Sequence, residues 1–162
     1  MVDSLRPASP PPPPTGWHVV VREQLDVFLA RWAVQRVAAQ LGFGKQDIGE
    51  LSIVVSELAT NILKYWPRGE ISLGRLDDPQ RGLGIEIVAE DEGPPLASLE
   101  SALRDGWGDR GPIDPAHLRR GGIGAGLGAI RRLTDSFEYH PGGARKSFRV
   151  ARYLRRPKPQ GV

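Results

Sequence analysis

A glycine-rich stretch, GGIGAGLG at Gly121–Gly128, constrains the fold of this 162-residue chain more than any other feature. It runs directly into AIRRL at Ala129–Leu133, which is typical of a helix. Glycines place no side chain between a ligand and the backbone, and the first N–H groups of a helix lack internal partners. Such a loop suits a phosphate group. The alternative is a flexible loop before a surface helix, because lone glycine patterns recur by chance.

The composition indicates one globular domain. Hydrophobic residues make up 40% of the chain and charged residues 25%, as in ordinary soluble proteins. The N-terminus lacks the basic start and apolar stretch of a secretory signal, and no apolar run reaches the length of a membrane span. We therefore expect a cytoplasmic protein without a membrane partner. The absence of cysteine excludes disulfides and zinc fingers.

The charge does not by itself indicate a nucleic-acid partner. The formal net charge is only +3. The basic residues do form clusters, at Arg119 and Arg120, Arg131 and Arg132, and Arg152, Arg155, Arg156 and Lys158. We interpret these clusters as solvated helix and tail surface and expect no nucleic-acid partner. A weaker alternative is a nucleic-acid-binding module that uses the C-terminal arginines.

The chain divides into three segments. Residues 1–16 contain five consecutive prolines, Pro10–Pro14, which favour an extended arm and cannot join a sheet ladder. We expect this arm to be a disordered spacer; the alternative is a peptide ligand for a groove. Residues 17–156 form the predicted folded domain, and residues 157–162 a flexible tail.

The first half of the domain predicts a strand, two helices and a hairpin. WHVVVR at Trp17–Arg22 has the branched residues of a strand. Glu23–Leu41 has apolar residues at helical spacing, and Lys45–Tyr65 repeats that pattern after a glycine stop. The apolar positions of the first helix are Leu25, Phe28, Leu29, Trp32, Ala33, Val37 and Leu41. Strands at Glu70–Leu76 and Leu83–Ala89 then flank a turn.

The second half adds a short helix, a loop and another strand pair. We predict a helix within Leu96–Leu103 and a mobile loop over Trp107–Arg120, which is rich in glycine, proline and charge. After the glycine stretch and its helix, Phe137–His140 and Ser147–Leu154 can pair as strands. This order predicts an α/β two-layer sandwich, in which helices cover one face of a mixed β-sheet.

Two polar residues of the second long helix form the first candidate site element. Glu57 and Asn61 are four residues apart, so their side chains project from the same face. A carboxylate and a carboxamide there could orient a water molecule and hold a magnesium ion through oxygen ligands. Taken alone, the pair is also compatible with a solvent-facing helix surface.

The second candidate element is AEDEGPP at Ala89–Pro95, where acidic residues end an apolar strand and a glycine follows. A carboxylate at a strand end can accept the exocyclic amine of a purine, while the glycine lets the ring approach. Acidic residues are also common in turns of every kind.

Several competing site patterns are excluded by their context. Gly124, Gly126 and Ala129 fit a dinucleotide-binding pattern, but that motif needs a strand directly before it, and DPAHLRR precedes it here. The chain contains no Walker P-loop and no nucleophile elbow. Its three histidines have no ligand-like spacing.

Three motifs in order resemble the nucleotide site of the GHKL ATPases, the family of histidine-kinase-like domains. They are ELATN at Glu57–Asn61, AEDEGP at Ala89–Pro94 and GGIGAGLGAIRRL at Gly121–Leu133. More closely, the chain resembles the anti-sigma factor serine kinases of bacteria, and among them the RsbT-type switch kinases of the stressosome pathway. The resemblance runs from about His18 to Leu154 and includes LGFG at Leu41–Gly44 and RRLTDSF at Arg131–Phe137.

The resemblance implies a role for each matching residue. Glu57 matches the glutamate that acts on the acceptor hydroxyl or attacking water, and Asn61 the asparagine that binds magnesium. Asp91 matches the aspartate that binds the adenine amine, and Gly93 the turn glycine beside it. The lid motif that holds the phosphates is matched by Gly122, Gly124, Gly126 and Leu127. Ser147 falls about where the family often has a threonine near the adenine.

The resemblance further implies the Bergerat (GHKL) ATP-binding fold and an ATP- and magnesium-dependent protein serine/threonine kinase. Its expected partner is a STAS-domain antagonist or scaffold. Alternatively, nucleotide only shapes the surface, and the chain sequesters a sigma factor or activates a PP2C-type phosphatase. Pro95 motivates this alternative, because a second glycine usually stands there in the family. The lid Trp107–Arg120 is also longer than in the RsbT type, and Arg119 or Arg120 could reach the γ-phosphate or remain exposed lid charge.

Overall fold

A computed structural model describes residues 11–12, 14–65, 68–104, 107–108, 111–112 and 126–154 of the chain. The elements follow the predicted order and lie close to the predicted bounds. They are β1 (Trp17–Val21), α1 (Gln24–Leu41), α2 (Lys45–Tyr65), β2 (Gly69–Asp78), β3 (Gly82–Asp91), α3 (Leu99–Ala102), β4 (Trp107–Gly108), β5 (Gly111–Pro112), α5 (Gly126–Arg132), β6 (Ser136–His140) and β7 (Lys146–Tyr153). Within the predicted loop over 107–120, the short strands β4 and β5 pair as a separate two-stranded sheet.

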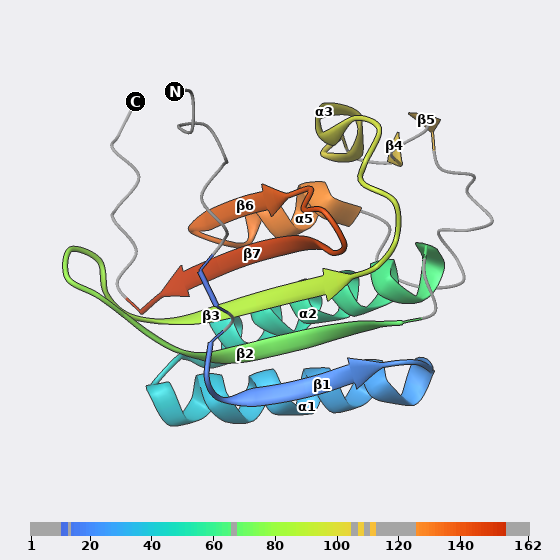
Figure 1. The fold of residues 1–162 in the computed structure, drawn as a ribbon. Helices are drawn as coiled ribbons and strands as arrows, with labels where there is room; N and C mark the ends of the chain where they lie inside the picture. The colour runs from blue at the N-terminus through green and yellow to red at the C-terminus, as the bar shows by residue number, and fades with distance from the viewer. Residues whose placement is uncertain are drawn as a thin grey trace, which may run out of the picture.

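The main sheet has five strands in the order β1-β2-β3-β7-β6 (Figure 1). Among the described strands every pairing is antiparallel, so the prediction of a mixed sheet was wrong in this respect. The sequence indicated the two hairpin-like pairs β2–β3 and β6–β7. It did not indicate that β3 and β7 would join them edge to edge in opposite directions, because that contact forms between strands far apart in the chain.

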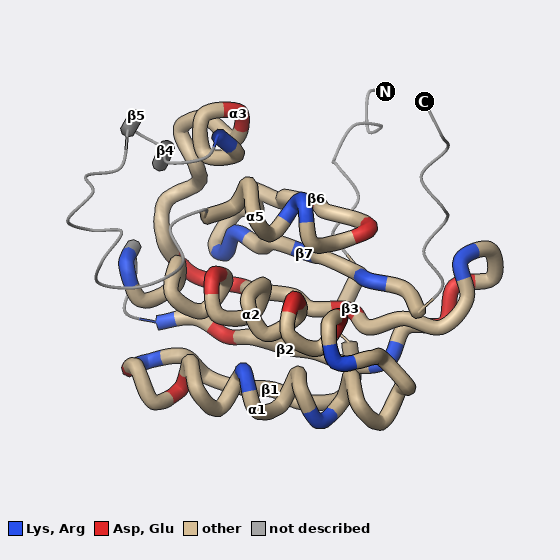
Figure 2. Tube along the Cα trace, turned by 180° about the vertical axis from the view of Figure 1, so that it is seen from behind, with Lys and Arg blue, Asp and Glu red and all other residues tan. Residues whose placement is uncertain are grey.

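The three longer helices α1, α2 and α5 cover one face of this sheet, which confirms the predicted two-layer sandwich (Figures 1 and 2). The core lies between the layers. It is built by apolar side chains of α2, such as Leu51 and Leu58, against strand residues such as Ile71, Ile87 and Val150. On β7, Phe148 and Val150 belong to this core and Arg152 pairs with two acidic residues of α2, so alternate side chains of the strand face the helices.

Helix α1 buries its small side chains and exposes its large ones. Its buried residues are Val27, Ala30, Ala33, Val34, Val37 and Ala38. Leu25, Phe28, Leu29 and Trp32 are instead exposed, although the sequence pattern grouped them with the apolar positions of this helix. The ring of Trp32 contacts Trp17 of β1 edge to face, with 5.1 Å between centroids. The apolar spacing therefore predicted the helix correctly but not which of its faces is buried.

Local signals explain where the helices begin and end. The Asp26 carboxylate accepts hydrogen bonds from the backbone N–H groups of Arg22 and Glu23, at 2.8 and 3.0 Å, which caps the start of α1. Gly42 ends the helix at φ 97°, a left-handed conformation that suits glycine. Among the described residues, no helix combines the length and the apolar character needed to cross a membrane.

The described part of the proline-rich arm lies along the sheet face opposite the helices. Arg149 on that face donates to the carbonyl of Pro12 at 3.2 Å and pairs with Glu86 of β3. At Gly74 an added Cβ atom would meet the carbonyl oxygen of Thr15 at 2.8 Å, so β2 and the arm are in close contact. Residues 11–12 and 14–16 thus cover part of this face.

Candidate nucleotide-binding site

Asp91 lies at the end of β3 and is buried on the helix side of the sheet. Its Oδ1 atom accepts a hydrogen bond of 2.8 Å from the backbone N–H of Gly93. This short turn, which the sequence DEG encodes, fixes the direction of the carboxylate. The structure therefore brings Asp91 and Gly93 together, in an arrangement where a carboxylate can accept a hydrogen bond from a ligand amine.

Gly69 allows helix α2 to approach Asp91 closely. Gly69 is the cross-strand partner of Asp91, and a Cβ atom added there would lie 2.6 Å from Ile62 Cγ2 and 3.1 Å from Asp91 Cβ. Because real Cβ contacts are longer than this, only glycine fits without displacement. The C-terminal half of α2 and the end of β3 thus meet at one edge of the core.

The two predicted residues of α2 lie in this half of the helix. Glu57 is 5% exposed, whereas Asn61 is half-buried and directly precedes Ile62. Their spacing of one helical turn places both side chains on the same side of α2, next to the layer that contains Asp91. A buried carboxylate so placed can receive a proton from a bound hydroxyl group.

Magnesium fits this site only together with a nucleotide. Among the described residues, no group of three or more His, Asp or Glu side chains is placed to hold a metal. Asn61 offers one amide oxygen, and magnesium is commonly bound by one or two protein ligands with phosphate oxygens and waters. Asn61 is therefore suited to hold a nucleotide-bound magnesium ion, whose charge would stabilise the phosphates.

The structure describes only the end of the glycine stretch. Gly126 begins α5 at φ 51°, and Leu127 is buried against the core. The helix thus starts three residues before the predicted Ala129. Gly122 and Gly124, like Arg119 and Arg120, lie outside the described residues, so their predicted roles at the phosphates remain predictions.

Lys146, which the sequence reasoning missed, contacts Asp91 directly. Its Nζ atom lies 2.8 Å from Asp91 Oδ1 and donates to the carbonyl of Pro94 at 3.0 Å, and the Lys146 and Asp91 side chains are 6% and 8% exposed. Asp91 and Lys146 are cross-strand partners, so their side chains share one face.

Ser147 does not share that face. Its cross-strand partner is Glu90, and alternation places its side chain on the opposite side of the sheet from Asp91. On β7 the residue beside Asp91 is therefore Lys146, and the predicted place of Ser147 near the adenine stays a prediction. The sequence did contain a signal for this. Lys146, Phe148 and Val150 are every second residue of one strand, so Lys146 is expected on the same face as the two apolar residues.

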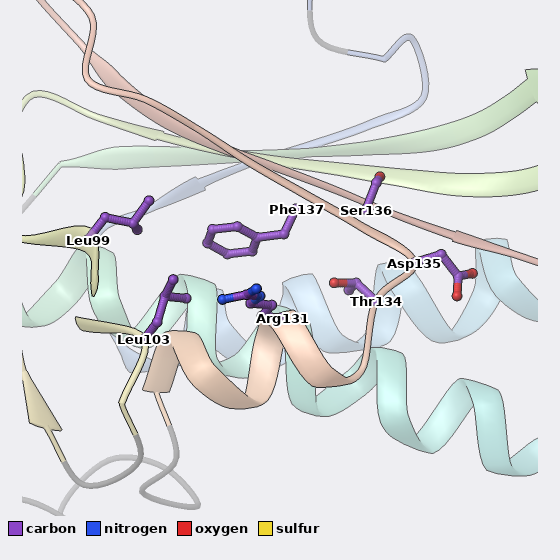
Figure 3. Close-up of a pocket in the computed structure, with 7 residues that line it drawn as sticks. All are labelled: Leu99, Leu103, Arg131, Thr134, Asp135, Ser136 and Phe137. Carbon is purple, nitrogen blue, oxygen red and sulfur yellow. The ribbon is translucent and has the colours of Figure 1, made fainter. Parts of the chain in front are cut away.

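A separate pocket of about 400 Å³ lies between α3, α5 and β6 (Figure 3). Its lining combines apolar and polar side chains, namely Leu99, Leu103, Arg131, Thr134, Asp135, Ser136 and Phe137. Among the described residues, none of the site residues predicted from the sequence lines it. The pocket is thus distinct from the edge where Asp91, Lys146 and α2 meet.

The fold and the site define a class of protein. Residues 22–150 match the family model of the histidine kinase-like ATPase domain, which covers most of the chain. The chain therefore belongs to the histidine kinase-like ATPase family, as its sequence motifs predicted.

Within this class the chain is similar to serine/threonine-protein kinase RsbT of Bacillus subtilis (strain 168). The two are 34% identical over 119 residues, which cover 74% of this chain and 81% of the relative. A solved structure of the RsbU and RsbW domains of a Mycobacterium tuberculosis protein shares the fold, with a TM-score of 0.56 and 14% identity. That match covers 92% of this chain, which spans 34% of the solved chain.

Proposed function

We propose that this chain is an ATP- and magnesium-dependent serine/threonine protein kinase of a partner-switching pathway that regulates a stress response or a sigma factor. The observation that carries the proposal is the buried Asp91 carboxylate, oriented by Gly93 and lying at the edge approached by α2. The 34% identity to a kinase over most of the chain supports it.

The proposed chemistry uses the chain's residues as follows. Asp91 accepts the exocyclic amine of the adenine. Glu57 takes the proton of the acceptor hydroxyl as its oxygen bonds to the γ-phosphorus and the bond to the β–γ bridging oxygen breaks, which leaves ADP. Asn61 would hold magnesium, which would neutralise phosphate charge, and the glycine stretch that includes Gly122, Gly124 and Gly126 would supply backbone N–H groups to the phosphates.

The proposed substrate is a serine or threonine of a STAS-domain protein, either an antagonist or a scaffold. The name of the relative, a serine/threonine-protein kinase, supports the acceptor chemistry. A PP2C-type phosphatase or a sigma factor would be a further binding partner, released or captured when the STAS protein changes its phosphorylation state. We place this activity in the cytoplasm.

The test is transfer of the γ-phosphate to a purified STAS-domain protein from the same organism. We expect phosphorylation in the presence of ATP and magnesium, detected by intact mass and located by peptide mass spectrometry. Asp91→Asn should abolish transfer, because it replaces the carboxylate that accepts the adenine amine. Glu92→Gln is the matched control, since Glu92 is the exposed acidic neighbour of Asp91.

Two outcomes would contradict the proposal. Equal transfer by wild type and Asp91→Asn would exclude this carboxylate from the site. Binding of the STAS protein or a phosphatase, without phosphate transfer to any STAS partner, would favour a module in which nucleotide only shapes the surface.

A further inference from the structure

The ion pair between Lys146 and Asp91 places hydrogen-bond donors beside the carboxylate that we propose binds the base. Asp91 Oδ1 already accepts from Gly93 N and Lys146 Nζ, at 2.8 Å each. An ammonium group has three N–H donors, and Lys146 uses two of them on Asp91 and the carbonyl of Pro94. Among the described residues no partner is seen for its third donor or for Asp91 Oδ2.

A carboxylate beside an ammonium group can bind a wider range of purines than a carboxylate alone. A carboxylate only accepts, so it matches the amine at position 6 of adenine and opposes the O6 acceptor of guanine or hypoxanthine. An ammonium group beside it adds a donor. The pair can then match adenine, with the amine on Asp91 and N1 on Lys146. It can also match a 6-oxopurine whose ring is displaced so that the two contacts exchange, with O6 on Lys146 and N1–H on Asp91.

We propose that Lys146 is a specificity-determining residue that admits 6-oxopurine nucleotides, as well as adenine nucleotides, to the Asp91 site. This inference rests on the proposed nucleotide site and extends it to the choice of base. Burial strengthens the effect, because a hydrogen-bonding site shielded from water rejects a base that leaves its polar groups unmatched. With Lys146 present, an acceptor atom of either purine, N1 of adenine or O6 of a 6-oxopurine, meets a donor.

Arg145 offers a control for charge. It precedes Lys146, but its guanidinium lies near Glu70 and Glu90, at 3.5 and 3.7 Å, on the other side of the sheet. Removing its charge therefore alters the local field by the same formal amount without removing a donor from Asp91.

Calorimetric titration of the full chain with magnesium and either ADP or inosine diphosphate tests the inference. These ligands differ in the base alone, as an amine in one is replaced by O6 in the other and N1 gains a proton. We expect the two dissociation constants to agree within about tenfold. Inosine diphosphate binding more than about 100-fold weaker than ADP would overturn this inference and leave the nucleotide site standing. Binding of neither ligand would overturn both.

Variants then assign the effect to Lys146. Lys146→Met should weaken inosine diphosphate relative to ADP by at least about tenfold, while Arg145→Met keeps the wild-type ratio. Lys146→Gln retains an N–H donor and should lose less, which provides a second comparison if the methionine variant does not fold. An unchanged ratio in both Lys146 variants would overturn the assignment.

Discussion

The guanidinium of Arg152 on β7 lies 2.6 Å from the Glu50 carboxylate on α2, between Nη1 and Oε2. Arg152 is 1% exposed, also pairs with Asp47, and donates to the carbonyl of Leu133 at 3.2 Å. One buried side chain thus connects the sheet to α2 and to the residue after α5. This connection holds the sheet and the helices together away from the proposed nucleotide site at Asp91.

We predict that removing Arg152 lowers stability less than neutralising its two acidic partners does. In Arg152→Met, the acidic partners retain 38% and 21% exposure and can reach water, so unfolding should become easier by only about 1–3 kcal/mol. Asp47→Asn with Glu50→Gln leaves the buried guanidinium without a counter-charge and should cost about 3–5 kcal/mol. Urea denaturation of both variants measures the difference. Equal losses would contradict it.

Gly69→Ala should damage both stability and the site. The new Cβ atom would meet Ile62 Cγ2 at 2.6 Å and the Glu90 carbonyl at 2.7 Å, and such overpacking costs about 1–3 kcal/mol. Because Asp91 Cβ lies beside the same point, nucleotide affinity should fall as well. Gly49→Ala is the control, since nothing lies within 4 Å of its added Cβ in α2, and it should stabilise by about 1 kcal/mol. Thermal melts and calorimetry with ADP measure the two effects.

Glu57→Ala should retain nucleotide binding and lose phosphate transfer. The carboxylate is buried on α2, one turn before Asn61, where its proposed role is to accept the hydroxyl proton. Loss of a general base lowers turnover by about 100-fold to 10,000-fold. Single-turnover transfer and ADP titration separate the two steps. Turnover equal to that of wild type would remove Glu57 from the chemistry.

Asn61→Ala should abolish magnesium-dependent nucleotide binding while the fold remains intact. Its half-buried amide is the one ligand that α2 is proposed to give to the ion, so titrations with and without magnesium should become identical. Circular dichroism provides the control. An unfolded variant would mean that Asn61 is structural and that its assignment to magnesium is wrong.

Asp78 makes the turn between β2 and β3 sensitive to acid. The pKa of its carboxyl is lowered by two backbone N–H groups, each donating at 2.8 Å. The N–H of Arg81 has the larger effect and that of Gln80 the smaller. A lowered folded-state pKa gives stability that is present above the unfolded value of about 3.9 and lost as pH falls through the folded value. Asp78→Ala should therefore lower the melting temperature at neutral pH and less so in acid. A deficit independent of pH would contradict this.

The sequence predicted the local parts of the site because their signals are local. Apolar spacing placed Glu57 and Asn61 on one helix, and the DEG turn placed Asp91 beside Gly93. The roles of Gly122 and Gly124 stay predictions, since these residues lie outside the described part of the chain. The place of Ser147 near the adenine also stays a prediction, and Lys146, which contacts Asp91, was not predicted.

By itself the sequence determined the family, the order of helices and strands, and the motifs that identify a nucleotide site, since periodicity and turn chemistry act over neighbouring residues. Only the tertiary structure decided that β3 and β7 pair antiparallel, that Lys146 faces Asp91, and that the large apolar side chains of α1 are exposed. The physical reason is that strand register and helix orientation are fixed by packing between segments distant in the chain, where a shift of one residue turns every side chain to the other face.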